Sequence, residues 1–232
     1  CYCDHRFLHL SFRLQGQMCI RDRPNLEVMS SLVAQMAKLH QQGVEVLFVS
    51  SGAIAAGLKL LNIKKYPKTM PERQGAAAVG QPILMDAYNK VFKKLGLNIA
   101  QILLTHSDLD ERERFLNACN TIDNLLHKKI IPIVNENDTV STEEIKFGDN
   151  DSLASQVAQM TRSGLVVILS DVEGIYSANP NIDKNAKLLS RVENLSDELI
   201  DVTGKSNNKF SHGGMVTKIS AIKVLSQILI KR

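Results

Sequence analysis

The sequence of 232 residues contains no tryptophan, and aromatic residues make up only 5% of it. It therefore offers no series of aromatic side chains on which the bases of a nucleic acid would stack. The net charge is only +4, from 28 Lys and Arg against 24 Asp and Glu, so a broad basic face is missing too. No run of about 18 apolar residues is present, as a membrane-spanning helix would need. We therefore expect neither nucleic-acid nor membrane partners.

Cysteine is scarce as well, and three of the four cysteines lie within the first 19 residues. Residues 1–23 also hold four arginines against two aspartates, which is +2 of the total +4. They show no clear helical or strand period, and their Cys and His spacing fits no zinc motif. We interpret residues 1–23 as a non-native or misassigned leader. Residues 24–232 then hold only Cys119, which is typical of a cytoplasmic protein in a reducing compartment.

What the sequence does contain is an alternation of helical and strand patterns. Hydrophobic residues are 44% and charged residues 22% of the chain, as in ordinary globular domains. Helical patterns cover residues 25–42, 74–95, 111–128, 151–162 and 214–231. Short apolar runs predict strands over residues 44–52, 98–104, 130–138 and 165–171. This order predicts one α/β domain with a mostly parallel sheet.

The carboxyl ends of the predicted strands are the expected place for a functional site, because ligands of open parallel sheets bind there. Three of these strands end in short polar segments, at residues 50–52, 135–138 and 170–171. The polar segments therefore supply the first candidate site residues.

The first polar segment belongs to VSSGAIAAG (residues 49–57), where small residues stand at a strand-to-helix turn. Gly52 lets a ligand approach the backbone closely, and free amides at a helix start favour an anion. Tight packing of a helix against the sheet through small residues explains the same pattern equally well. The sequence contains no Walker A loop, so a P-loop site is not expected.

Two polar clusters, NEND (residues 135–138) and DND (residues 149–151), are joined by a short connector. Their amide and carboxylate groups suit the ammonium group of an amino acid, a metal ion or a catalytic lysine. A solvated acidic loop is the alternative, because Asn and Asp favour turns on their own account. Asp151 would also suit the N-cap of the helix that follows.

The third candidate is SHGGMVTK (residues 211–218), in which a glycine pair opens a predicted helix and Lys218 lies on its first turns. Phosphoryl transfer uses such an arrangement, with amides around the phosphates and an ammonium group that balances charge. A solvated lysine on a helix surface is the alternative for Lys218.

Taken in this order, the motifs resemble the amino acid kinase family, and within it the members that phosphorylate glutamate. The resemblance covers residues 25–232 and is carried by VSSGAIAAG, QGAAAVGQ, LLTHSDLDERERFLNA, IPIVNENDTV, EIKFGDND, LSDVEGIY and GGMVTK. It implies a three-layer sandwich around a mostly parallel central sheet, truncated at both ends. It also implies ATP-dependent phosphorylation of the γ-carboxylate of L-glutamate to L-glutamyl 5-phosphate, the first step of proline biosynthesis.

The resemblance also implies a role for each matching residue. Lys218 would stabilise charge on the transferred phosphoryl group, and Asp151 would orient catalytic lysines. The glutamate site would comprise Ser51, Asn135, Asp138, Asp149 and Asn150. The ATP site would comprise Ser170, Asp171, His212, Gly213, Gly214, Met215, Val216, Thr217 and Lys218, with Mg²⁺ bridging the phosphates. The nucleophile would be the substrate's own carboxylate, so no nucleophile from the enzyme is needed.

The sequence departs from the family pattern in three respects. The family begins with a strand that carries a phosphate-binding Lys in a K-x-G-[ST]-S motif, whereas residues 1–23 contain no lysine. Ser211 and His212 stand where the family has Gly and Thr. The chain also stops at Arg232, before the family's last strands. We therefore expect an incomplete domain over residues 24–232, an absent first strand and impaired turnover.

Two other functions stay open at this point. The chain would be a kinase for acetylglutamate or aspartate, or a non-catalytic module that binds ATP and an amino acid. The family further implies a homo-oligomer and feedback inhibition by proline. We expect His106, His127 and Cys119 to be ordinary surface or packing residues rather than catalytic groups.

Overall fold

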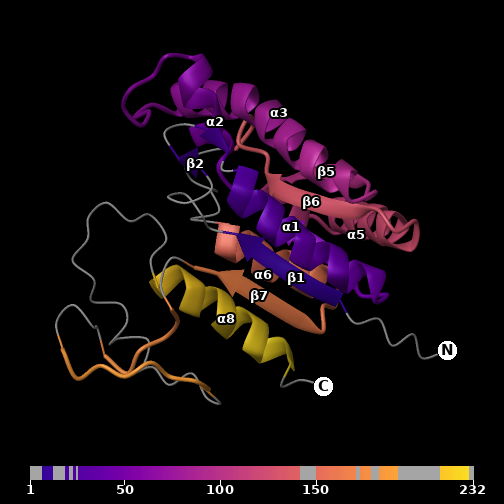
Figure 1. The fold of residues 1–232 in the computed structure, drawn as a ribbon, viewed down its shortest axis with the longest axis vertical. Coiled ribbons are helices and arrows are strands. Elements are labelled where there is room, and N and C mark those ends of the chain that lie inside the picture. Colours follow the sequence, from indigo (N-terminus) through magenta and orange to yellow (C-terminus); the bar gives the residue numbers. More distant parts are fainter. Residues whose placement is uncertain are drawn as a thin grey trace.

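The computed structural model describes residues 7–12, 19–20, 23–24, 26–141, 150–170, 173–178, 183–192 and 215–229. Its central sheet has five parallel strands in the order β5-β6-β4-β1-β7 (Figure 1). These strands are β1 (Phe7–Phe12), β4 (Glu45–Val49), β5 (Ile99–Leu104), β6 (Ile131–Glu136) and β7 (Leu165–Leu169). The short strands β2 (Cys19–Ile20) and β3 (Arg23–Pro24) pair antiparallel in a second sheet.

Helices lie on both sides of the central sheet, which confirms the predicted α/β sandwich (Figure 1). They are α1 (Leu26–Gln41), α2 (Ala53–Leu60), α3 (Met70–Lys94), α4 (His106–Asp110), α5 (Arg112–His127), α6 (Asn150–Met160) and α8 (Met215–Leu229). Each helix predicted from apolar spacing is present within a few residues of its expected bounds. The largest difference is α3, which begins at Met70 rather than at residue 74 because Thr69 and Glu72 form a capping box.

Alternating side chains of the strands build a hydrophobic core on each face of the sheet. In β4, Val46 and Phe48 face a cluster with α1 and α3, whereas Leu47 and Val49 face a cluster with α5 and α6. All four side chains are fully buried. The continuous apolar run of this strand thus reflects burial on both faces, as expected for a parallel sheet.

Strand β1 lies inside the sheet, between β4 and β7, with Leu10 opposite Phe48 on one side and Val167 on the other. The expectation that the first strand is absent is therefore wrong. The six residues FLHLSF are too short and too interrupted by polar residues to stand out as a strand, and their pairing depends on two distant partners. Whether residues 1–23 are native stays a prediction.

Helices α2 and α3 approach each other with backbone against backbone. A Cβ atom on Gly57 would lie 1.9 Å from the carbonyl oxygen of Ala76, and one on Gly80 would lie 1.8 Å from that of Ala53. The small residues of VSSGAIAAG therefore do serve tight packing, although they pack against a helix rather than the sheet. None of the described helices is long and apolar enough to cross a membrane.

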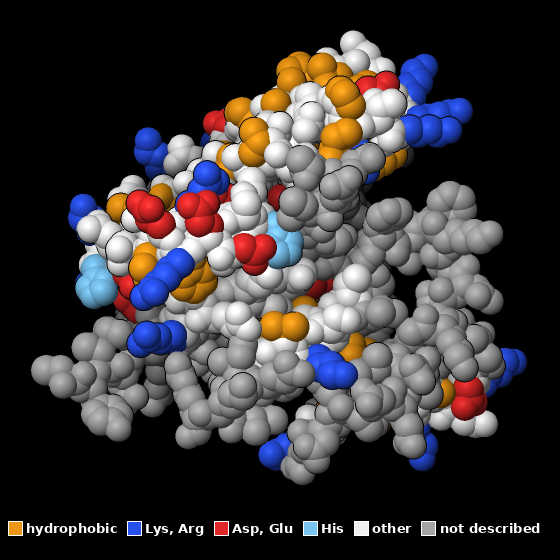
Figure 2. Space-filling view, turned by 180° about the vertical axis from the view of Figure 1, so that it is seen from behind, with side chains coloured by type: hydrophobic (Ala, Val, Ile, Leu, Met, Phe, Trp, Pro, Cys, Tyr) orange, Lys and Arg blue, Asp and Glu red, His pale blue; other side chains and the backbone are white. Residues whose placement is uncertain are grey.

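On the face of the molecule opposite to that of Figure 1, acidic and basic side chains of the described residues are interspersed (Figure 2). This distribution agrees with the nearly balanced composition of 28 basic and 24 acidic residues.

Candidate active site

The polar segments predicted as site residues follow strands that run in the same direction. Residues 50–52 follow β4, Asn137 and Asp138 follow β6, and Ser170 follows β7. Because all strands of the sheet are parallel, these segments lie at one edge. The backbone turns away from β4 at Gly52, whose φ of 100° is in the left-handed region that favours glycine. Gly52 is also the N-cap of α2, and it provides no side-chain cap.

Asn150 joins the exits of β4 and β6 to the start of α6. Its Nδ2 donates to the side-chain Oδ1 of Asn135 over 3.0 Å and to the backbone carbonyl of Ser50. Asn135 is buried, with only 2% of its surface exposed. Two residues predicted to bind substrate, Asn135 and Asn150, are thus brought into direct contact.

The amide contacts continue from Asn135 into α3. The Nδ2 of Asn135 donates to Gln81 Oε1 over 2.9 Å, and Gln81 Nε2 donates to Gln101 Oε1 over 3.3 Å. Neither glutamine was predicted as a site residue from the sequence. The available signal was a glutamine among the small and apolar residues of a buried helix face, where a polar side chain needs a specific partner.

Asp151 and Lys218 form a buried ion pair at the start of α6 and α8. The Lys218 Nζ lies 3.0 Å from Asp151 Oδ2 and 3.3 Å from Oδ1. Asp151 is fully buried and Lys218 is 6% exposed, while Thr217 Oγ1 lies 3.5 Å from the same carboxylate. The carboxylate of Asp151 faces Lys218 from within the helix, so neither an N-cap nor a solvated lysine describes these residues.

The NEND segment is partly buried rather than a fully solvated loop. Glu136 is 5% exposed and its Oε1 accepts a hydrogen bond of 2.7 Å from Ser141 Oγ. The carbonyl of Ser141 in turn accepts from Gln74 Nε2 over 3.1 Å. Helix α3 therefore contacts Asn135 at the start of the NEND segment and Ser141 three residues beyond its end.

Asp138 is half-buried and lies within electrostatic reach of Tyr66, in the connection between α2 and α3. Burial and the negative charge of Asp138 raise the pKa of the Tyr66 hydroxyl, while Arg73 lowers it. The phenol of Tyr66 therefore senses the charge of a carboxylate predicted to hold substrate. Tyr66 was not predicted as a site residue from the sequence.

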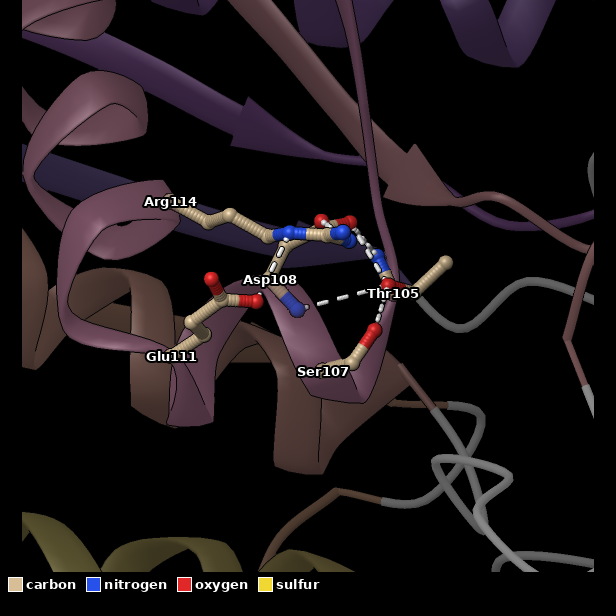
Figure 3. A network of polar contacts seen from close by, with 5 residues as sticks. All are labelled: Thr105, Ser107, Asp108, Glu111 and Arg114. Carbon is tan, nitrogen blue, oxygen red and sulfur yellow. Dashed lines mark hydrogen bonds and ion pairs between the residues drawn. The ribbon is translucent and has the colours of Figure 1, made fainter.

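A network of polar contacts around Asp108 follows the end of β5 (Figure 3). Its Oδ2 accepts from the backbone N–H of Thr105 over 2.7 Å, and Arg114 Nη1 lies 3.3 Å from its Oδ1. Arg114 also contacts Glu111 over 2.9 Å. Burial raises the pKa of Asp108, but the hydrogen bonds from Thr105 and Arg114 outweigh burial and hold it below its ordinary value of 3.8.

One residue predicted for the glutamate site, Asp149, and several predicted for the ATP site lie outside the described residues. The latter are Asp171, His212, Gly213 and Gly214, together with the side chains of Met215 and Val216 at the start of α8. Their roles stay predictions, as do those of Ser51 and Ser170, whose backbone positions at the sheet edge are described.

The remaining candidate groups have local partners. His127 Nδ1 lies 2.7 Å from the carbonyl of Asp123, and His106 Nδ1 lies 3.0 Å from Asp110. Burial and the charge of Asp123 raise the pKa of the Cys119 thiol above 9.0, so this cysteine is not an activated nucleophile. Over the described ranges, no group of three or more His, Cys, Asp and Glu side chains is placed to hold a metal ion.

The sequence profile of the amino acid kinase family matches residues 16–227. The chain belongs to this family. The match agrees with a parallel sheet covered on both sides by helices and with polar residues at the carboxyl edge of that sheet.

Among curated relatives, the chain is 48% identical to a protein named glutamate 5-kinase from Thermoanaerobacter sp. strain X514. The match spans 200 residues, 86% of this chain and 54% of that relative. A glutamate 5-kinase from Clostridium acetobutylicum is 46% identical over 203 residues, 88% of this chain and 76% of the relative. One from Geobacter sulfurreducens is 48% identical over 203 residues. The chain thus spans about half the length of several relatives that it matches.

Proposed function

We propose that the chain is the catalytic domain of an enzyme that transfers the γ-phosphoryl group of ATP to the γ-carboxylate of L-glutamate. The observation that carries the proposal is the buried Lys218–Asp151 pair. Asp151 lies in the first turn of α6, one residue after the substrate candidate Asn150. The names of the similar proteins and the family match support the same activity.

The proposed step is an in-line displacement at phosphorus. A γ-carboxylate oxygen of glutamate forms a bond to the γ-phosphorus of ATP, the bond to the β,γ-bridging oxygen breaks, and ADP leaves with that electron pair. A glutamate carboxyl group has an ordinary pKa of about 4.3 and is ionised at neutral pH. The enzyme therefore needs to position and to stabilise charge, and it needs no general base.

The polar groups at the exits of β4 and β6 suit an amino acid. The carboxylate of Asp138 matches the ammonium group of the substrate, and Asp149 would add a second acceptor. The uncapped N-terminus of α2 beside Ser51 favours a carboxylate. Asn135 and Asn150 would complete the glutamate site.

The nucleotide would lie between the exit of β7 and the start of α8. Ser170, with Asp171, would contact the nucleotide, and residues 212–218 would surround its phosphates. In this arrangement Lys218 balances charge on the moving phosphoryl group and Asp151 keeps its ammonium group in place. When bound, Mg²⁺ neutralises phosphate charge, and because it is held mainly by phosphates and water it requires few protein ligands.

The test is a coupled assay of ADP release by the 232-residue chain with L-glutamate, aspartate and acetylglutamate. We expect turnover with glutamate but not with aspartate or acetylglutamate, at a rate lowered by the missing lysine motif. Equal or greater turnover with acetylglutamate or aspartate would overturn the choice of substrate.

The absence of lysine from residues 1–23 favours a second candidate, a module that binds ATP and glutamate without turnover. Calorimetric titration with each ligand separates the two, because the module would bind both ligands and release no ADP. Homo-oligomerisation, inhibition by proline and a cytoplasmic location stay predictions.

A further inference from the structure

Gln81 is a buried polar side chain whose position the proposed chemistry leaves unexplained. It lies in the middle of α3, is 8% exposed, and reaches across to the end of β6. A buried amide has to satisfy both its donor and its acceptor, so its partners show what it is built to hold.

The orientation of the Asn135 amide follows from a backbone contact. The N–H of Glu136 donates to Asn135 Oδ1 over 2.9 Å, and a backbone N–H can only be a donor. The oxygen of Asn135 is therefore on that side, and its Nδ2 is the atom that donates to Gln81 Oε1 over 2.9 Å. Glu136 and Gln81 thus hold the Asn135 amide from opposite ends.

The same Asn135 oxygen accepts from Asn150 Nδ2 over 3.0 Å. Since Asn150 Nδ2 also donates to the carbonyl of Ser50, its donors are directed at the protein. The side-chain Oδ1 of Asn150 is then the atom that can accept a hydrogen bond from a ligand. An acceptor suits the ammonium group of an amino acid.

We propose that Gln81 is a positioning residue, which holds the Asn135 amide so that Asn135 in turn fixes Asn150 with its oxygen toward the substrate. Gln101 completes the series, because it accepts from Gln81 Nε2 over 3.3 Å and so keeps the Gln81 oxygen directed at Asn135. The link to glutamate rests on the proposed function, whereas the link to the two asparagines does not.

The first test follows the side-chain NH₂ groups of Asn135 and Asn150 by NMR in the ligand-free 232-residue chain. Gln81→Met keeps the length of the side chain but removes its acceptor. We expect the NH₂ signals of both asparagines to shift and to exchange faster with solvent. An unchanged Asn150 signal in Gln81→Met would overturn the proposal, whatever the chain's activity.

The second test measures the Kd values of L-glutamate and ATP by calorimetry. Loss of the buried acceptor in Gln81→Met should raise the Kd of glutamate about tenfold. The Kd of ATP should stay within twofold of the parent value. Gln81→Glu keeps an acceptor oxygen for Asn135, and the exposed Gln101 can turn to donate to it, so we expect glutamate binding within about threefold of the parent chain. Equal weakening by both variants would contradict the acceptor role.

Thr161→Val is the matched control for a loss of buried polarity. Thr161 is 5% exposed and donates to the carbonyl of Val157 at the far end of α6 from Asn150. This variant should change neither the asparagine signals nor the Kd of glutamate. If the parent chain binds no glutamate, the proposed function fails, and the NMR comparison still decides the role of Gln81.

Discussion

At the scale of single residues, Lys218 and Asp151 form an ion pair in which both charged groups are buried. Both groups are out of water, and a buried charge is stable only while its partner is present. Because Asp151 is fully buried, it cannot recover hydration if the ammonium group is removed. The pair therefore couples the predicted chemistry to the stability of the contact between α6 and α8.

Lys218→Met should lower the free energy of unfolding by about 3–5 kcal/mol, because it leaves the Asp151 carboxylate buried and unpaired. Urea denaturation followed by circular dichroism measures the change. The double variant Lys218→Met/Asp151→Asn removes the stranded charge and should be more stable than Lys218→Met alone. A double variant that is less stable than either single variant would contradict this account.

The lowered pKa of Asp108 predicts that the stability of the chain falls as the pH is lowered. Its folded pKa is depressed, so its contribution to stability is present above its ordinary value of 3.8 and is lost as the pH falls through the folded value. Asp108→Asn should therefore be less stable than the parent chain at pH 7, and the difference should shrink toward pH 3. Urea denaturation at both pH values provides the comparison.

Glu111→Gln is the control for the same network, since Glu111 pairs with the same Arg114 but at an exposed position. Exposed ion pairs contribute little, so its effect should be small at pH 7 and at pH 3. A stability difference for Asp108→Asn that grows as the pH falls would show that the hydrogen bonds of Asp108 do not favour its ionised form.

At the scale of elements, the contact between α2 and α3 depends on the absence of side chains at two glycines. Gly80 faces the carbonyl oxygen of Ala53, and the obstructing atoms belong to the backbone and cannot turn aside. This contact sets the position of α3, which carries Gln74 and Gln81 toward the NEND segment. Packing of small residues and the geometry of the candidate site are thus linked through one helix.

Gly80→Ala should destabilise the fold by about 1–3 kcal/mol or more, because the added methyl group forces α2 and α3 apart. Gly75→Ala lies in the same helix with open space around it and should stabilise by about 0.5–1 kcal/mol through helix propensity. Thermal unfolding of the two variants measures both changes. Equal melting temperatures would contradict the close approach of the helices.

At the scale of the whole molecule, β1 joins the two parts of the sheet. It is hydrogen-bonded to β4 on one side and to β7 on the other. The exits of β4 and β6 supply the candidate glutamate site, whereas the exit of β7 carries Ser170, a proposed nucleotide contact. Strand β1 therefore determines the distance between the two proposed sites, although it lies within residues 1–23, which were interpreted as a leader.

Leu10→Pro should disrupt the sheet, because proline removes a backbone donor from a strand that is paired on both sides. Hydrogen exchange should accelerate at the amides of the neighbouring strands β4 and β7, and the melting temperature should fall. Leu10→Ala keeps the backbone donor and serves as the control. Unchanged exchange in Leu10→Pro would instead favour a leader that the fold does not need.

The order of elements and the edge that carries the site could be predicted because their signals are local. Apolar spacing marks a helix or a strand within a dozen residues, and polar residues at strand ends mark where a parallel sheet binds ligands. Asp151, Asn150 and Lys218 could be chosen as candidate site residues in the same way, because each belongs to a short motif whose residues lie close together in the chain.

The contacts that organise the site were not readable in this way, because they join residues far apart in the chain. Asp151 meets Lys218 across 67 positions and Asn135 meets Gln81 across 54, and neither pairing leaves a periodic trace. Strand β1 was missed for the same reason, because this short segment of six residues forms a strand only by pairing with two distant strands. Local sequence patterns therefore specify the elements and their chemistry, and packing over long separations specifies which groups meet.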